Sequence, residues 1–167
     1  MLACPAVLNS SHYQMGNPFP VLPQLCFPSY QPPLRPEGNG WAIYDPVRQM
    51  YVALTPEEWV RQSLLHYLLG YLGYPAGLMA VERLVEVNRQ PQRADVVAYS
   101  RRAIPYLLVE CKAPSVPIDR AVLEQAARYN AVLHARYFAV TNGLVSHIFS
   151  VEGAAPRHLG AEWPAYE

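Results

Sequence analysis

Lysine is nearly absent from this sequence. Lys112 is the one lysine, whereas 12 side chains are arginine. The formal net charge is zero, so the composition lacks the basic balance that usually accompanies nucleic-acid binding. Any nucleic-acid function must therefore depend on a local site, and the single lysine is the first candidate for one.

Cysteine is also scarce, and no long apolar run is uninterrupted. Cys4, Cys26 and Cys111 are far apart and form no CxxC pair, which argues against structural zinc and against a disulfide framework. We therefore expect a reducing compartment, the cytoplasm. Residues 1–12 lack the basic start and apolar core of a signal peptide. Residues 62–81 carry no charge, but glycine and proline interrupt them, so we expect no membrane helix.

The composition predicts one globular domain after a proline-rich leader. Apolar residues make up 51% of the 167 residues and charged residues 16%, which suits a folded domain with a core. Residues 1–36 hold eight of the 17 prolines and no acidic residue. We interpret them as an extended or disordered leader. The folded domain is assigned to residues 37–167, with regular structure from near Gly40.

The pattern of apolar residues predicts an α/β fold. Thr55 is a good N-cap, Pro56 suits the first helical position, and Glu58 completes a capping box. Asp119 caps a second, amphipathic helix. Helices are predicted at 55–70 and 119–134, and strands at 41–54 (two short ones), 78–88, 93–99, 104–112, 136–141 and 144–150. This order predicts a mixed β-sheet flanked by helices.

Three charged residues of the central strands are expected to meet. Residues two apart in a strand share a face, so Glu110 and Lys112 project together. Asp95 lies among apolar residues on the preceding strand, where a carboxylate needs a partner. If the two strands pair as a hairpin, Asp95 comes near Glu110, and two adjacent carboxylates favour a cation between them. Magnesium fits, because it takes one or two carboxylates plus waters and a substrate phosphate.

The choice of lysine at 112 has two interpretations. The ammonium is a compact charge whose pKa can fall on burial, and it can orient a water or stabilise a charged phosphate. The alternative is a surface salt bridge with Glu110, which would be the ordinary explanation for an isolated Glu-x-Lys. We favour the chemical role because this is the only lysine and because Asp95 precedes it.

The sequence resembles a known family. Asp95 followed by Glu110-Cys111-Lys112 across a strand pair is similar to the PD-(D/E)XK nuclease superfamily, with its restriction-endonuclease-like core. Residues 22–150 resemble the N-terminal nuclease domain of type I restriction enzyme R subunits in a short stand-alone form. The stretches that carry the resemblance are DPVRQMYVALTPEEWVRQ (45–62), RADVVAY (93–99), LLVECKAP (107–114), QAARYN (125–130) and TNG (141–143).

The resemblance implies roles for individual residues. Asp95 and Glu110 would bind the metal, and Lys112 would assist the attacking water. A further glutamate from the first helix would be Glu58, with Glu57 as second choice; the alternative for Glu58 is the helix cap alone.

Other positions of the family pattern have simpler alternatives. Gln125 and Tyr129 match a QxxxY element near the active site, and their alternative is a solvated glutamine and a packing tyrosine. Asn142-Gly143 matches the TNG element, although a hairpin turn explains it nearly as well. Glu82, on the first core strand, is expected only to lie behind the metal-binding residues, without contacting the metal itself.

The sequence thus predicts a magnesium-dependent DNA endonuclease, with Mn²⁺ as a substitute metal. We expect Arg89, Arg93, Arg101 and Arg102 to contact DNA phosphates. These 167 residues contain no helicase-like motor, so a separate motor or methyltransferase subunit is the expected partner. The alternative is a catalytically silent module that kept the nuclease fold for binding or assembly. An RNA substrate is left open, as are target, strand preference and oligomeric state.

Overall fold

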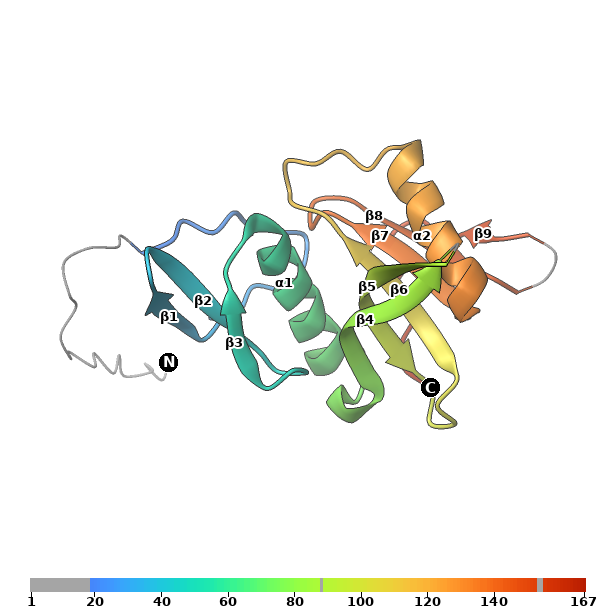
Figure 1. The fold of residues 1–167 in the computed structure, drawn as a ribbon, viewed down its shortest axis with the longest axis horizontal. Helices are drawn as coiled ribbons and strands as arrows, with labels where there is room; N and C mark the ends of the chain where they lie inside the picture. Colours follow the sequence, from blue (N-terminus) through green and yellow to red (C-terminus); the bar gives the residue numbers. More distant parts are fainter. Residues whose placement is uncertain (1–18, 88, 153–154) are drawn as a thin grey trace, which may run out of the picture.

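The computed structural model describes residues 19–87, 89–152 and 155–167, and Figure 1 shows two β-sheets with helix α1 between them. The smaller sheet is antiparallel, in the order β1-β2-β3. Its strands are β1 (Leu34–Glu37), β2 (Gly40–Asp45) and β3 (Met50–Ala53). The larger sheet has the order β4-β5-β6-β7-β8-β9. Its strands are β4 (Met79–Val87), β5 (Gln90–Tyr99), β6 (Pro105–Cys111), β7 (Tyr137–Thr141), β8 (Ser146–Ser150) and β9 (Arg157–His158).

The larger sheet is mixed, as predicted. Strands β6 and β7 are parallel, because helix α2 (Arg120–Leu133) carries the chain back between them. The other neighbouring pairs are antiparallel. Strand β9 was not predicted, because its two residues are too short for a periodic pattern. Strand β5 also begins earlier than predicted, at Gln90. It includes Pro91, which is tolerated there because it lies near the β4–β5 hairpin at the edge of the sheet.

Both long helices begin where the sequence predicts. Helix α1 (Pro56–Gly70) starts after Thr55, whose hydroxyl accepts a hydrogen bond from the Glu58 amide at 3.0 Å. Helix α2 follows Asp119, whose carboxylate accepts from the Val122 amide at 3.0 Å. A single turn of 3₁₀-helix, η1 (Ala76–Leu78), leads into β4. The two caps fix where the helices start relative to the sheet.

The two faces of the large sheet have separate apolar cores. Val60, Leu64 and Leu68 of α1 pack on one face against residues such as Val96 and Leu107. On the other face, Ala126 and Tyr129 of α2 pack against residues such as Val97, Leu108 and Val140. Alternate residues of β5 and β6 thus serve the two helices, as the period of a strand requires. This sandwich confirms the predicted α/β class.

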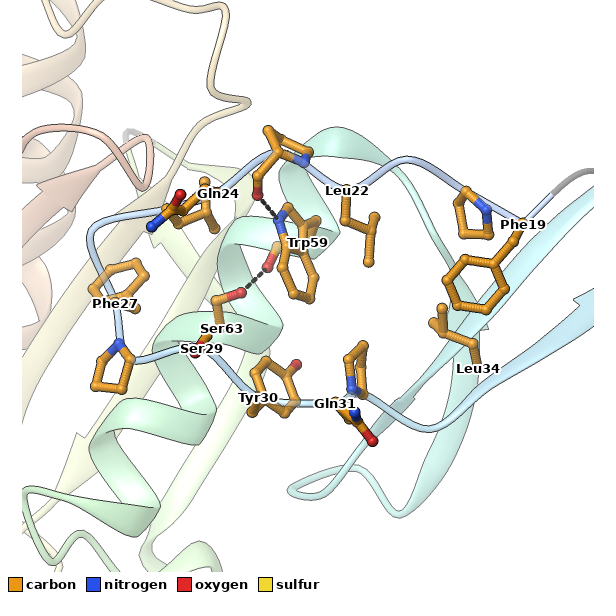
Figure 2. Close-up of a pocket in the computed structure, with 15 residues that line it drawn as sticks. Phe19, Leu22, Gln24, Phe27, Ser29, Tyr30, Gln31, Leu34, Trp59 and Ser63 are labelled. Atoms are coloured by element: carbon orange, nitrogen blue, oxygen red, sulfur yellow. Dashed lines mark hydrogen bonds between the residues drawn. The ribbon is translucent and has the colours of Figure 1, made fainter. Parts of the chain in front are cut away.

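An extended segment, residues 19–33, crosses α1; we call it the N-terminal strap. It loops around Trp59, whose indole N–H donates to the Pro23 carbonyl at 2.9 Å (Figure 2). Tyr30 stacks on Trp59 and on His66, with ring centroids 5.7 and 4.2 Å apart. The predicted leader of residues 1–36 is extended over this part, while residues 1–18 lie outside the described residues.

The predicted boundary at residue 36 falls inside strand β1. Leu34 and Arg35 pair with Ile43 and Ala42 of β2, so regular structure begins before Gly40. This strand, LRPE, has only four residues and includes Pro36, so it shows no apolar pattern from which a strand could be predicted. Within the described part of the chain, no helix is both long and apolar enough to cross a membrane.

Candidate functional site

The hairpin of β5 and β6 brings Asp95 and Glu110 to the place where their ladder ends. The register pairs Val96 with Val109, so Asp95 and Glu110 are the next positions on each strand. The Cys111 amide donates to Asp95 Oδ2 at 2.7 Å, which ties the carboxylate directly to β6. Both carboxylates are buried, Asp95 at 8% and Glu110 at 3% exposure. The hairpin assumed in the sequence analysis is therefore present.

Glu110 is the centre of a connected group of side chains. Its Oε1 accepts from Lys112 Nζ at 2.7 Å and from Gln125 Nε2 at 2.9 Å. Gln125 Nε2 lies 3.0 Å from the Tyr129 hydroxyl, which in turn donates to Gln92 at 3.4 Å. The predicted residues Gln125 and Tyr129 thus lie beside Glu110 and Lys112, and not on an unrelated surface of α2. Their catalytic roles stay predictions.

Asp95 is paired with an arginine that the sequence analysis did not single out. Arg61 Nη2 donates to Asp95 Oδ1 at 2.6 Å. Arg61 is itself buried, with a side chain 6% exposed. A second contact joins Arg61 Nη1 to Glu58 Oε2. The sequence held a signal for that second contact, because residues three apart on a helix are neighbours. The Arg61–Asp95 contact spans 34 residues and had no such signal.

The two glutamates at the start of α1 face different partners. Glu58 Oε1 accepts from Arg48 and from Gln62, each at 2.8 Å, and Oε2 accepts from Arg61. Both oxygens of the preferred metal-ligand candidate are thus engaged with donors. Glu57 is part-exposed, and burial together with the Asp95 charge raises the pKa of its carboxyl. Glu57, the second choice, lies 3.4 Å from the Arg61 Nη2 that also contacts Asp95.

Burial and mutual repulsion dominate the electrostatics of the site. Burial, followed by the Asp95 charge, raises the pKa of Glu110 to about 7, although Lys112 opposes the change. Burial would lower the pKa of Lys112, but the hydrogen bond from Lys112 to Glu110 and the surrounding carboxylates raise it instead. Lys112 is therefore held as an ammonium, contrary to the fall in pKa that the sequence analysis considered. Burial also raises the pKa of the Cys111 thiol well above its ordinary value.

The site has an unsatisfied oxygen that suits a metal ion. Glu110 Oε2 is buried and, among the described residues, has no hydrogen-bond partner. A carboxylate oxygen in that state, beside a second carboxylate, matches the oxygen ligands that Mg²⁺ prefers. Within the described ranges, no three His, Cys, Asp or Glu side chains form a complete metal-binding group. Two carboxylates, completed by water and a substrate phosphate, are the donor set that fits.

The four arginines predicted to contact DNA do not form one cluster. Arg93 is exposed and lies 3.7 Å from Glu82. Arg101 and Arg102 belong to the turn between β5 and β6, at the opposite end of β6 from Glu110. At about 3.3 Å per residue, the strand separates them from Glu110 by more than about 15 Å. Arg101 and Arg102 are thus misplaced in the prediction, because sequence proximity to β5 does not say which end of the hairpin a residue occupies.

Asn142 and Gly143 shape the turn after β7. Asn142 Oδ1 accepts from the amides of Leu144 and Val145 at 3.0 and 2.9 Å, while Nδ2 donates to the Val116 carbonyl at 2.9 Å. Gly143 has a φ of +81°, and a Cβ there would lie 2.7 Å from the Leu25 side chain of the strap. The turn therefore joins the loop after Lys112 to the strap, beyond the hairpin role considered for it.

A cavity of about 660 Å³ lies between the strap and α1. Figure 2 shows Tyr30, Trp59 and Phe27 around it. None of Asp95, Glu110 and Lys112 lines this cavity. The chemistry-bearing side chains are thus separate from this cavity.

A family model described as the type I restriction enzyme R protein N terminus matches residues 56–158. The chain belongs to this family. The matched region includes Glu57, Asp95, Glu110, Lys112 and Gln125, and it begins where α1 begins. Membership in the R protein N-terminal family confirms the resemblance drawn from the sequence and places the chain among restriction-type nuclease domains.

A solved structure supports the same fold. It is the fragment structure of a putative HsdR subunit of a type I restriction enzyme from Vibrio vulnificus YJ016, with a TM-score of 0.50 and 19% identity. The similarity covers 67% of this chain and 24% of that one, so this chain matches about a quarter of its length. A search of curated proteins finds no match.

Proposed function

We propose that this chain is a metal-dependent nuclease domain that hydrolyses phosphodiester bonds in DNA. The supporting observation is the group formed by Asp95, Glu110 and Lys112 at the end of the β5–β6 ladder. In the part of the chain that the structure describes, Glu110 Oε2 is buried and has no hydrogen-bond partner. Asp95 and Glu110 would hold Mg²⁺, or Mn²⁺ in its place. When bound, the ion neutralises phosphate charge and makes water a stronger nucleophile.

Lys112 has a defined task in this proposal. Its ammonium is fixed by Glu110 at 2.7 Å, and the raised pKa keeps it protonated at neutral pH. A protonated amine donates hydrogen bonds and stabilises negative charge, but it does not accept a proton. Lys112 would therefore orient water or stabilise the charge that develops on the phosphate.

Gln125 and Tyr129 would orient the carboxylate. Gln125 donates to the same Glu110 oxygen that Lys112 contacts, which leaves the second oxygen free of these donors. Tyr129 fixes Gln125 from the same face of α2. This arrangement presents Glu110 Oε2 to a cation, and Glu57 adds negative charge at the more exposed side of the group.

Cleavage assays with matched variants test the proposal. The parent protein is incubated with plasmid, single-stranded DNA and RNA, each with Mg²⁺, Mn²⁺ or EDTA. We expect metal-dependent cleavage of DNA that is lost in Lys112→Ala and kept in Arg120→Ala. Arg120 is the matched control because it is a cation with a side chain 92% exposed on α2. Nucleic-acid binding without cleavage by the parent would favour the silent module, and cleavage of RNA alone would change the substrate class.

A further inference from the structure

Acidic and guanidinium groups alternate between the small sheet and the candidate metal site. Asp45, at the end of β2, accepts from Arg48 Nε at 2.6 Å. Arg48 Nη2 donates to Glu58 at 2.8 Å, Glu58 accepts from Arg61, and Arg61 donates to Asp95 at 2.6 Å. We call this run the arginine relay. It connects the β2–β3 turn to the carboxylate of β5 through buried or partly buried side chains.

Asp95 is held on both of its oxygens by groups that cannot move freely. Oδ1 accepts from Arg61 and Oδ2 from the Cys111 amide. Because a buried guanidinium is stable only when it is paired, Arg61 is as constrained as the carboxylate it contacts. The planar fork of arginine can place one N–H on Asp95 and another on Glu58, whereas a lysine ammonium lacks that geometry.

The backbone around Asp95 departs from regular pairing on both sides. Val81 pairs with Val96 and Arg83 with Ala94, so Glu82 occupies the register position opposite Asp95. Glu82 has a φ of +52°, a left-handed conformation that a residue with a side chain rarely adopts in a strand. Its carboxylate accepts from Arg48 Nη1 at 2.9 Å. Glu82 is therefore also joined to the arginine relay, through Arg48.

We propose that Arg61 is a positioning residue that sets the orientation of Asp95 for metal binding, and that Glu58 acts through Arg61 and not as a metal ligand. This inference rests on the proposed function. Donors from Arg48, Gln62 and Arg61 hold Glu58, and the Arg61 guanidinium lies between Glu58 and Asp95. Among the described residues, Glu110 Oε2 has no hydrogen-bond partner. Glu57 lies 3.4 Å from the same Arg61 Nη2 that contacts Asp95, so it is the first-helix carboxylate that this proposal places beside the metal.

Metal affinity in three variants tests the proposal. Free Mn²⁺ is measured by electron paramagnetic resonance during titration of each protein, and thermal melting is recorded for the same preparations. Arg61→Lys keeps the charge and removes the fork. Arg48→Lys is the matched control, because Arg48 contacts the same Glu58 but not Asp95. Glu58→Gln removes the charge and keeps an oxygen that accepts from Arg61.

We expect Arg61→Lys to bind Mn²⁺ at least tenfold more weakly and to lose DNA cleavage by at least a hundredfold. Arg48→Lys should stay within threefold of the parent in Mn²⁺ affinity. Glu58→Gln should lose less affinity than Arg61→Lys does, because glutamine still offers Arg61 an acceptor. A folded Arg61→Lys protein within threefold of the parent would overturn the role of Arg61. A loss of Mn²⁺ affinity in Glu58→Gln that exceeds the loss in Arg61→Lys could not act through Arg61, so it would make Glu58 a ligand and overturn the second half of the proposal.

Two further outcomes are distinguishable. If Arg61→Lys melts below the assay temperature, Arg61→Gln replaces it with the same thresholds, and Glu58→Gln still decides the role of Glu58. If the parent protein itself neither binds Mn²⁺ nor cleaves DNA, the proposed function fails first. A parent that binds and cleaves while Arg61→Lys does the same would refute the positioning role alone.

Discussion

Replacing Glu110 with glutamine should stabilise the metal-free protein at alkaline pH. The folded state raises the pKa of Glu110 from 4.5 to about 7, through burial first and the Asp95 charge second. Between these values the folded protein binds more protons than the unfolded chain, so its free energy of unfolding falls as pH rises. Glutamine has nearly the same shape and does not titrate. The variant therefore escapes a penalty that the parent acquires between about pH 4.5 and 7.

The size of the effect follows from the same pKa values. A pKa difference of one corresponds to about 1.4 kcal/mol, so the stability of the variant relative to the parent should rise by about 2–3 kcal/mol from pH 5 to pH 8. The change with pH is the quantity to compare, because the substitution also alters the contact between residue 110 and Lys112. For a protein of this size, 2–3 kcal/mol corresponds to roughly 4–12 °C in melting temperature.

Urea unfolding at pH 5, 6, 7 and 8 in EDTA measures this difference directly. Glu162→Gln is the control, because Glu162 is exposed and should show no divergence from the parent. Mg²⁺ should then stabilise the parent at pH 8 and leave Glu110→Gln unaffected, since the variant lacks the oxygen anion. Parallel stability profiles for the parent and Glu110→Gln across this range would refute the electrostatic account of the site.

Three other predictions concern the site and its support. Lys112→Arg should melt like the parent yet lose cleavage by at least about a hundredfold, or about 2.7 kcal/mol of transition-state stabilisation; an unchanged rate would mean that any cation serves. Glu57→Gln should weaken Mn²⁺ binding more than Glu58→Gln does, and the reverse order in one titration series would return the ligand role to Glu58. Gly143→Ala should lower the free energy of unfolding by about 1–3 kcal/mol, because φ is positive there and Leu25 lies 2.7 Å from the new Cβ. Gly70→Ala, with open space around it, should be neutral or stabilising.

Local patterns were sufficient for the elements that carry the site. Thr55 and Asp119 correctly indicated where both helices start, and the apolar runs around Asp95 and Glu110 correctly indicated the paired strands. Because the side chains of a strand alternate, the Glu110–Lys112 contact could be inferred from spacing alone. The family resemblance supplied Gln125 and Tyr129, which spacing alone would have left as surface residues.

Contacts between residues far apart in the chain could not be predicted from local patterns. Arg48 contacts Glu82 across 34 residues, and Arg61 contacts Asp95 across the same separation. No periodicity encodes such contacts, since they depend on how the β2–β3 turn, α1 and the β5 strand pack together. The choice between Glu57 and Glu58 as the first-helix ligand stays a prediction for a related reason. One residue on a helix rotates a side chain by about 100°, and the rotation could be fixed only once the sheet was in place.

The N-terminal strap has a practical consequence for where this protein can be divided. The family match begins at Pro56, yet Trp59, four residues into the matched region, hydrogen-bonds Pro23 and stacks with Tyr30. Leu25 fills the space over Gly143 in the turn after β7. A shortened chain starting at Pro56 would bare an aromatic stripe of α1 to water and invite self-association. For separate expression or for fusion to another protein, the useful junction therefore lies ahead of Phe19.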